Sequence, residues 1–219
     1  MIRIVLFVFF SVLPILSRGQ NTWQYWNEVG IQYPFSQSFA VGFASEQRIT
    51  NNIKTFALHN YGLAVHYKFN NHFKIKVNYL HEQEKKIDWR TENRIEIIPG
   101  ISFNTKKEFL FSIFPRFEYR IFKEESHWRW RQKFDIRKPI LISEKKFTPY
   151  LSNELFYSFN SNTLNQNWFT AGINAPINAS ITIEFYYRLT SQKSLGNWKY
   201  DNNMGTTFSY SLNHKTKQK

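Results

Sequence analysis

The chain has 219 residues, no cysteine and a formal net charge of +13. The lack of cysteine excludes a disulfide framework and a thiolate metal site. Aromatic residues make up 19% of the chain, yet the mean hydropathy is only −0.49. The basic residues alternate with aromatic residues and are interspersed with acids, which disfavours a nucleic-acid-binding patch.

The amino terminus has the features of a secretory signal peptide. A basic start at Arg3 precedes an uncharged apolar run over residues 4–16, and Ser17 and Gly19 supply small residues before a cleavage site. A spanning helix would need about 20 apolar residues, and this run is shorter. The pattern therefore predicts a signal peptide over residues 1–19 and an exported mature chain.

The rest of the chain alternates apolar and polar residues with period 2, which is the pattern of β-strands. No candidate strand is followed by a helical pattern. Eleven candidate strands lie at residues 23–35, 39–48, 61–69, 73–80, 94–103, 109–121, 128–137, 151–157, 169–174, 181–189 and 207–212.

The segments between these strands predict alternating short turns and long loops. Polar loops are expected at residues 82–88, 158–165 and 191–202, and tight turns at 36–37, 70–71, 104–107, 141–146 and 178. With short turns on the periplasmic side, the amino terminus falls on the wrong side of a membrane. Either an extra strand or a crossing of the lumen by residues 23–26 would resolve this, and an even strand number is expected. Pro99 and Pro115 predict local bulges.

The composition of the two strand faces decides which one points inward. The polar face favours Arg with Glu, a pairing suited to enclosed networks, and it also holds small residues such as Gly42 and Gly62. The other face, rich in Phe, Tyr, Trp and Ile, is too bulky for the inside of a small barrel. We therefore predict an all-β fold: a transmembrane, up-and-down antiparallel β-barrel of ten to twelve strands over residues 20–214, followed by a basic tail at 215–219. The alternative is a secreted, soluble lipocalin-like barrel.

The predicted lumen carries a ladder of acidic and basic side chains. It would either line a narrow anion-selective channel or fill and brace the barrel of a structural or interaction protein. The predicted lumen network consists of Glu46, Arg48, Arg94, Glu96, Arg116, Glu118, Arg120, Arg129, Arg131, Asp135, Arg137, Glu154, Glu184 and Arg188.

Two resemblances accompany this pattern. The last strand, with Gly205, Phe208 and Tyr210, resembles the carboxy-terminal signal that the barrel-assembly machinery reads in outer-membrane proteins. The charged segments 46–48, 116–120, 129–131 and 153–156 resemble a Bacteroidota family catalogued as domain of unknown function 2490. That resemblance implies a barrel in the outer membrane of a Gram-negative cell and brings no known activity.

An outer-membrane lipid-modifying enzyme, of the phospholipase or lipid A deacylase type, is a further alternative. His81, His214 and Ser45 lie on the outward face, but no orienting acid accompanies them in the sequence. His59 and His66 fall on different faces and form no ligand set, so neither a metal nor a cofactor is predicted. The expected partners are outer-membrane lipid and lipopolysaccharide, whose phosphates the lysines near residues 84–86 and 193–199 would contact.

Overall fold

The computed structural model describes residues 22–194 and 196–212, in which every regular element is a strand. The predicted signal peptide, the basic tail and His214 lie outside these residues, so the domain boundaries stay predictions. The strands are β1 (Trp23–Pro34), β2 (Phe39–Thr50), β3 (Thr55–Lys68), β4 (Phe73–Lys85), β5 (Trp89–Asn104), β6 (Leu110–Ile121), β7 (Ser126–Arg137), β8 (Ile140–Ile142), β9 (Lys145–Ser158), β10 (Thr163–Pro176), β11 (Ile181–Ser194) and β12 (Asn197–Ser211).

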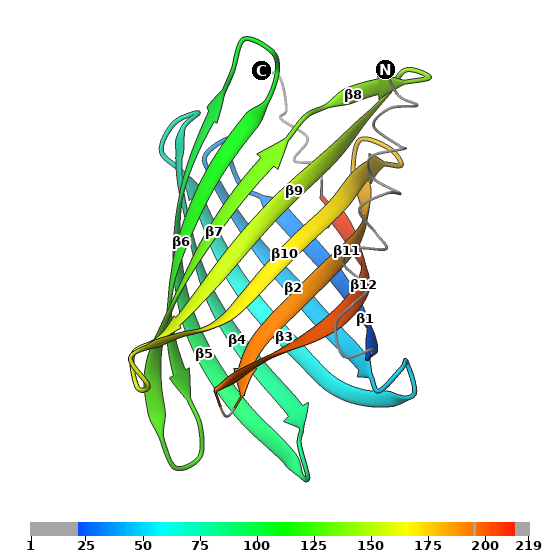
Figure 1. The fold of residues 1–219 in the computed structure, drawn as a ribbon. Helices are drawn as coiled ribbons and strands as arrows, with labels where there is room; N and C mark the ends of the chain where they lie inside the picture. Colours follow the sequence, from blue (N-terminus) through cyan, green and yellow to red (C-terminus); the bar gives the residue numbers. More distant parts are fainter. Residues whose placement is uncertain (1–21, 195, 213–219) are drawn as a thin grey trace.

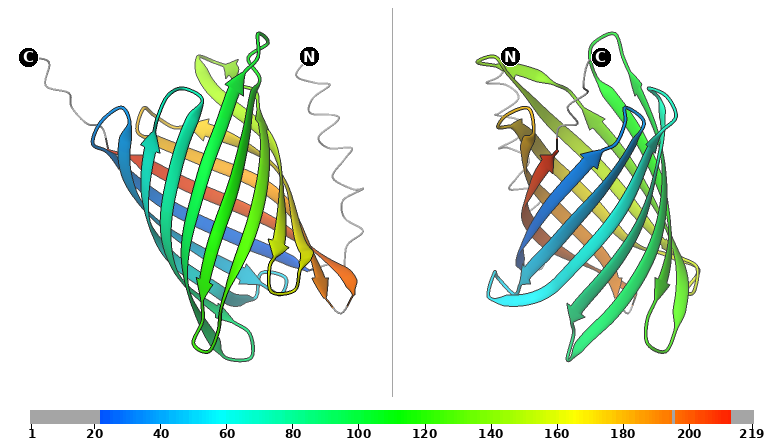
Figure 2. Two further views of the ribbon diagram at one scale, coloured as in Figure 1. Left: turned by 90° about the vertical axis from the view of Figure 1, so that its left-hand side faces the viewer. Right: turned by 180° about the vertical axis from the view of Figure 1, so that it is seen from behind.

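The strands form one closed barrel (Figure 1). β8 pairs only with β9 and extends one hairpin beyond the rim, so eleven strands form the wall. All wall pairs are antiparallel except the last, because β1 and β12 close the barrel in parallel, from Trp23 opposite Asn202 to Gln32 opposite Ser211. Figure 2 shows both arrows pointing the same way. The predicted all-β barrel is confirmed, with a strand number inside the predicted range.

The parallel seam corrects two expectations of the sequence. An even strand number is needed only when the first and last strands meet antiparallel, so the expected even number was wrong. Residues 23–26 lie in the wall as the start of β1 and do not cross the lumen, and no additional strand stands between β1 and β12. With an odd number of wall strands, β1 begins at one rim and β12 ends at the other.

The expected alternation of short turns and long loops is also wrong. Residues 82–85 belong to β4, and β11 and β12 cover most of residues 191–202. As the strand bounds stand, no connection is longer than five residues. At residues 82–85, the polar composition that suggested a loop comes from the end of β4, where the inward Glu82 is charged and buried.

Three turns at the upper rim of Figure 1 are built in the same way. In each, one side-chain oxygen accepts hydrogen bonds from the backbone N–H groups two and three residues later. Ser36, Asn70 and Asn178 supply these oxygens, at 2.8 to 3.2 Å. The turn expected at Asn70 is present, and its side-chain cap, rather than a positive φ, shapes it.

Pro99 and Pro115 interrupt one ladder without a bulge. β5 and β6 keep one register on both sides, with Ile97 opposite Phe117 and Ile101 opposite Ile113. The same register sets the two prolines opposite each other, and neither has an N–H to donate. The expected bulges at these prolines were wrong; register shifts occur instead at Arg48/Ile49 and Leu164/Gln166.

The charged face of the wall points into the barrel and the aromatic face points outward, as the sequence predicted. Leu63 on the outer face is 64% exposed, whereas Glu118 on the inner face is fully buried. A lipocalin-like barrel would place its aromatic face inside, and here that face lies outside. Within the described ranges, no helix is both long and apolar enough to cross a membrane.

Candidate functional site

Glu118 of β6, whose carboxylate is fully buried, is the centre of a network of ion pairs inside the barrel. It accepts hydrogen bonds from Arg129 and, at 3.0 Å, from Nη1 of Arg131, both on β7. Nη1 of Arg116 lies 3.9 Å away. The strand register causes this convergence, since Glu118 stands directly opposite Arg129 and Arg116 directly opposite Arg131.

A second carboxylate extends this centre to the next strand. Glu154 of β9 accepts a hydrogen bond from Nε of Arg131 at 2.9 Å, and Nη2 of Arg116 lies 3.9 Å from it. The contact between Arg116 and Glu154 joins β6 to β9 over the intervening β7. These arginines therefore link strands that are not neighbours in the wall.

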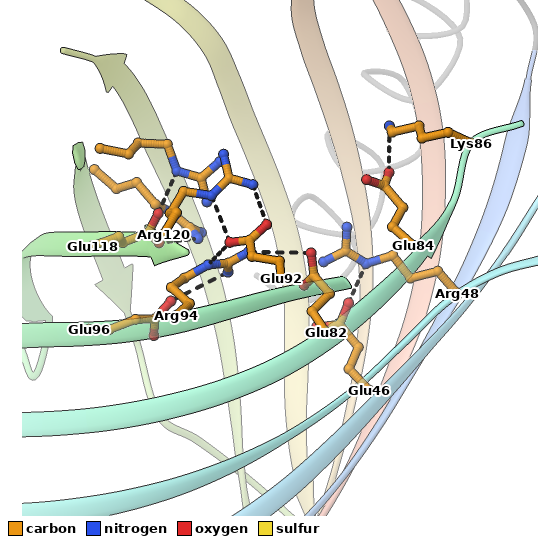
Figure 3. A network of polar contacts seen from close by, with 12 residues as sticks. Glu46, Arg48, Glu82, Glu84, Lys86, Glu92, Arg94, Glu96, Glu118 and Arg120 are labelled. Atoms are coloured by element: carbon orange, nitrogen blue, oxygen red, sulfur yellow. Dashed lines mark hydrogen bonds and ion pairs between the residues drawn. The ribbon is translucent and has the colours of Figure 1, made fainter. Parts of the chain in front are cut away.

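A second group of ion pairs surrounds Arg94 of β5 (Figure 3). Its Nε donates to Glu92 at 2.7 Å, and its Nη2 donates to Glu82 of β4 at 3.3 Å. Arg120 of β6 also holds Glu92, with Nε and Nη2 at 2.7 and 2.5 Å from its two oxygens. Glu96 joins the groups, because it lies 3.5 Å from Arg94 and 3.4 Å from Arg116.

Three inward aromatic side chains, Trp26 of β1, Phe156 of β9 and Trp168 of β10, lie beside these ion pairs. The ring of Trp168 lies 5.3 Å from that of Trp26 and 4.7 Å from that of Phe156. Arg131 stands 4.2 Å from the Phe156 ring, and Arg48 stands 3.8 Å from the Trp26 ring. Cations that lie over ring faces are stabilised by the ring quadrupole. Through these ring contacts, the side chains of β7 and β9 are connected with those of β1 and β2.

We call these ion pairs and rings together the belt; its members are Trp26, Arg48, Glu82, Glu92, Arg94, Glu96, Arg116, Glu118, Arg120, Arg129, Arg131, Glu154, Phe156, Trp168 and Arg188. Most of the residues that the sequence singled out are therefore brought together in one layer. The sequence interpretation missed Trp26 and Trp168, although each lies two residues from a polar residue, Glu28 or Thr170, and therefore on the same face of its strand. It also missed Glu82 and Glu92, because Glu82 fell in an expected loop and Glu92 preceded its strand.

The predicted lumen residues outside the belt form separate contacts, and Arg188 of the belt forms a further one. Arg137 donates to Asp135 at 2.6 Å, and Arg48 pairs with Glu46 beside the belt. Glu184 accepts a hydrogen bond from the Tyr150 hydroxyl at 2.7 Å. Arg188 donates to the Thr170 hydroxyl at 3.0 Å while its guanidinium lies over Trp168.

Inward glycines accommodate aromatic rings on neighbouring strands. A Cβ added to Gly205 would lie 2.1 Å from Cζ of Tyr186, the residue directly opposite. Gly172 has the same relation to Tyr150, at 2.7 Å. Gly205 of the proposed assembly signal thus has a packing role, whereas Phe208 and Tyr210 of that signal are outward on the same strand, opposite Val29 and Ile31 of β1.

The suggested lipid-modifying pair does not meet. Ser45 and His81 both point outward, but Tyr61 of β3 stands between them in the register. Strands lie about 4.8 Å apart, so the two residues are roughly 10 Å apart. His81 Nδ1 is 2.9 Å from Oδ1 of Asn93, which is not an acid. Among the described residues, no group of His, Asp or Glu is placed to hold a metal ion.

Comparison with known proteins gives one assignment. No curated protein matches the chain. The model of a family described as "Protein of unknown function (DUF2490)" matches residues 23–201, from the first residue of β1 into β12. The match includes every belt residue, so the ion pairs and rings described above lie inside the family's domain. Because the match covers most of the chain, this β-barrel protein belongs to the DUF2490 family of unknown function.

Proposed function

We propose that this protein spans the outer membrane of a Gram-negative cell as a filled barrel, with a structural or interaction role rather than that of an open diffusion channel. The observation that carries the proposal is the belt, because its side chains enter the lumen from nine strands around the barrel, β1, β2, β4 to β7 and β9 to β11. Outer-membrane lipid and lipopolysaccharide would surround the barrel, and the barrel-assembly machinery would insert it.

The outer face supports the membrane location. Large apolar side chains are exposed on the wall, and a soluble monomer rarely exposes apolar patches beyond a few hundred Å². In a bilayer the same surface contacts lipid, and the charges stay inside. Exposed apolar residues on this face include Val29, Ile31, Phe43, Leu63, Val65, Val77, Ile95, Ile97, Phe117, Phe134, Leu151, Phe185 and Phe208.

Contacts across the lumen support the filled state. Arg48 of β2 lies 5.9 Å from the ring of Trp168 on β10, although three strands separate β2 and β10 along the wall. Glu96 and Phe156 are each only 1% exposed, which shows that side chains enclose them on the lumen side. Barrels of about 8 strands are filled by side chains and those of 16 to 18 hold channels, and this wall lies nearer the filled class.

Membrane location is tested by fractionation. The protein should sediment with outer membranes, resist extraction by carbonate and by salt, and migrate more slowly on gels after boiling. Release by carbonate alone would contradict the membrane location.

The filled lumen is tested by conductance in planar bilayers. The wild type should give no stable conductance steps. The double substitution Arg131→Ala with Trp168→Ala should produce them, because it removes two large belt side chains that contact each other, with Arg131 4.9 Å from the Trp168 ring. Trp128→Ala, which removes an outward and half-exposed ring, serves as the matched control and should stay silent. Steps in the wild type would refute the filled state and favour a narrow channel.

A further inference from the structure

A second lumen feature lies beside the β1–β2 and β3–β4 turns, which stand at the upper rim of Figure 1. These turns and the adjoining inner wall line an open cavity of about 640 Å³. Small-molecule sites commonly have about 300–1,000 Å³. We call this cavity the mouth; its inward polar lining includes Gln32, His66, Lys68, Lys74, Lys76 and Ser102.

The lysines of the mouth are held differently from the arginines of the belt. Among the described residues, Lys68, Lys74 and Lys76 form no ion pair. The ammonium of Lys74 lies 4.8 Å from the ring of Phe114. Of the nearby carboxylates, Asp135 is already engaged by Arg137.

The strand register sets two of these cations directly opposite each other. Lys68 of β3 stands directly opposite Lys74 of β4, whereas the residue opposite Lys76 is His66. Like charges directly opposite each other destabilise a sheet. Glu96 and Glu28 interact with Lys76 electrostatically, but neither forms an ion pair with it, and Glu96 is bound by belt arginines. A sequence that keeps an unfavourable pair such as Lys68 and Lys74 at a cavity commonly does so for function.

An apolar groove adjoins the mouth on the outer face. This groove, of about 460 Å³, is lined by Phe69, Phe73, Ile75, Pro99 and Ile101. It also shares Lys74 with the mouth. The groove therefore connects the basic mouth with the outer face of the barrel, which contacts lipid under the proposed function.

From the cavity, the unpaired lysines and their like-charge register, we infer that the mouth binds a phosphate-bearing anion. Compact ammonium groups bind phosphate as point charges. Gln32 and Ser102 line the same cavity and supply polar groups for the remaining phosphate oxygens. The anion is either a soluble phosphate compound or a lipid whose headgroup carries a phosphate monoester; in the second case the groove would hold its acyl chain.

Calorimetric titration of the purified protein in detergent micelles, with inorganic pyrophosphate and with phosphatidic acid, tests the inference at low ionic strength. Lys74→Gln with Lys76→Gln should weaken binding at least tenfold, and Lys74→Arg with Lys76→Arg should retain most of it. The matched control is Lys54→Gln with Lys123→Gln, which removes two exposed cations from turns at the opposite rim and should leave affinity unchanged. The gel mobility shift on boiling verifies that each variant is folded.

The two probes distinguish the sources of phosphate. Equal binding of both indicates a soluble anion. Tighter binding of phosphatidic acid, weakened by Ile101→Ala while pyrophosphate binding is unchanged, indicates a lipid. Binding of neither probe, or equal affinity in the two glutamine double variants, overturns the inference. Because these titrations need no bilayer conductance, their failure would leave the filled-barrel proposal standing.

Discussion

The belt and the mouth hold positive charge in the same lumen by opposite means. In the belt, arginines share carboxylates, and Glu118 is shared by Arg129, Arg131 and Arg116. In the mouth, lysines line an open cavity and form no ion pair with any described residue, and Lys68 faces Lys74 across a strand pair. The guanidinium fork suits a fixed network, whereas a mobile ammonium suits a replaceable ligand. One region is therefore built for stability and the other for binding.

Replacing Glu118, the central carboxylate of the belt, should cause the largest loss of unfolding free energy. Glu118→Gln leaves three arginines with one acceptor fewer in a fully buried site. Breaking a buried pair commonly costs about 3–5 kcal/mol, so we expect a loss of that order in unfolding free energy. Urea titration of the micelle-bound barrel measures it.

The matched control for this substitution is Glu125→Gln. Glu125 pairs with Arg90 at 2.9 Å, but both side chains are about half exposed, so the change should be within about 1 kcal/mol. Comparable losses in the two variants would show that the belt does not brace the barrel.

An intermediate effect is expected for Gly205→Ala. The new methyl group would overlap the Tyr186 ring, and overpacking commonly costs about 1–3 kcal/mol. Gly30→Ala is the control, because the nearest atom to its new Cβ is an oxygen of Phe43 at 3.9 Å. Refolding of purified protein separates packing from signal recognition: a Gly205→Ala defect seen only in cells would assign the glycine to assembly instead.

The smallest effect on stability is expected in the mouth. Lys74→Gln with Lys76→Gln relieves the cross-strand pair of Lys68 with Lys74, so urea unfolding should show no loss, and a gain of up to about 1 kcal/mol. A loss of several kcal/mol would mean that these lysines brace the barrel as the arginines do. It would then remove the contrast on which the binding inference rests.

Local patterning predicted much of this structure because strand geometry is periodic. Alternation at Arg116, Glu118 and Arg120 fixed which side chains share a face, and the pairing of Arg with Glu indicated that this face is enclosed. The same rule, applied to Trp26 and Trp168, would have placed both inside. The inward position of these two residues was not predicted, because large apolar rings are expected on the lipid side.

Strand ends were predicted less well, since a charged strand end and a loop have the same composition. Residues 82–85 were expected to form a loop, yet they belong to β4, and Glu82 is buried there against Arg94 of β5. Only the partner strand supplies the charges that make such a residue favourable inside a barrel.

The sequence by itself determined an all-β barrel with an ionic inside and an aromatic outside, because period-2 alternation assigns each residue to a face without reference to other strands. The tertiary structure decided the eleven-stranded parallel closure, the convergence of Glu118 with its arginines and the clustering of lysines at one rim. Those features depend on register and on which strands meet across the lumen, and contacts between residues distant in the chain set both.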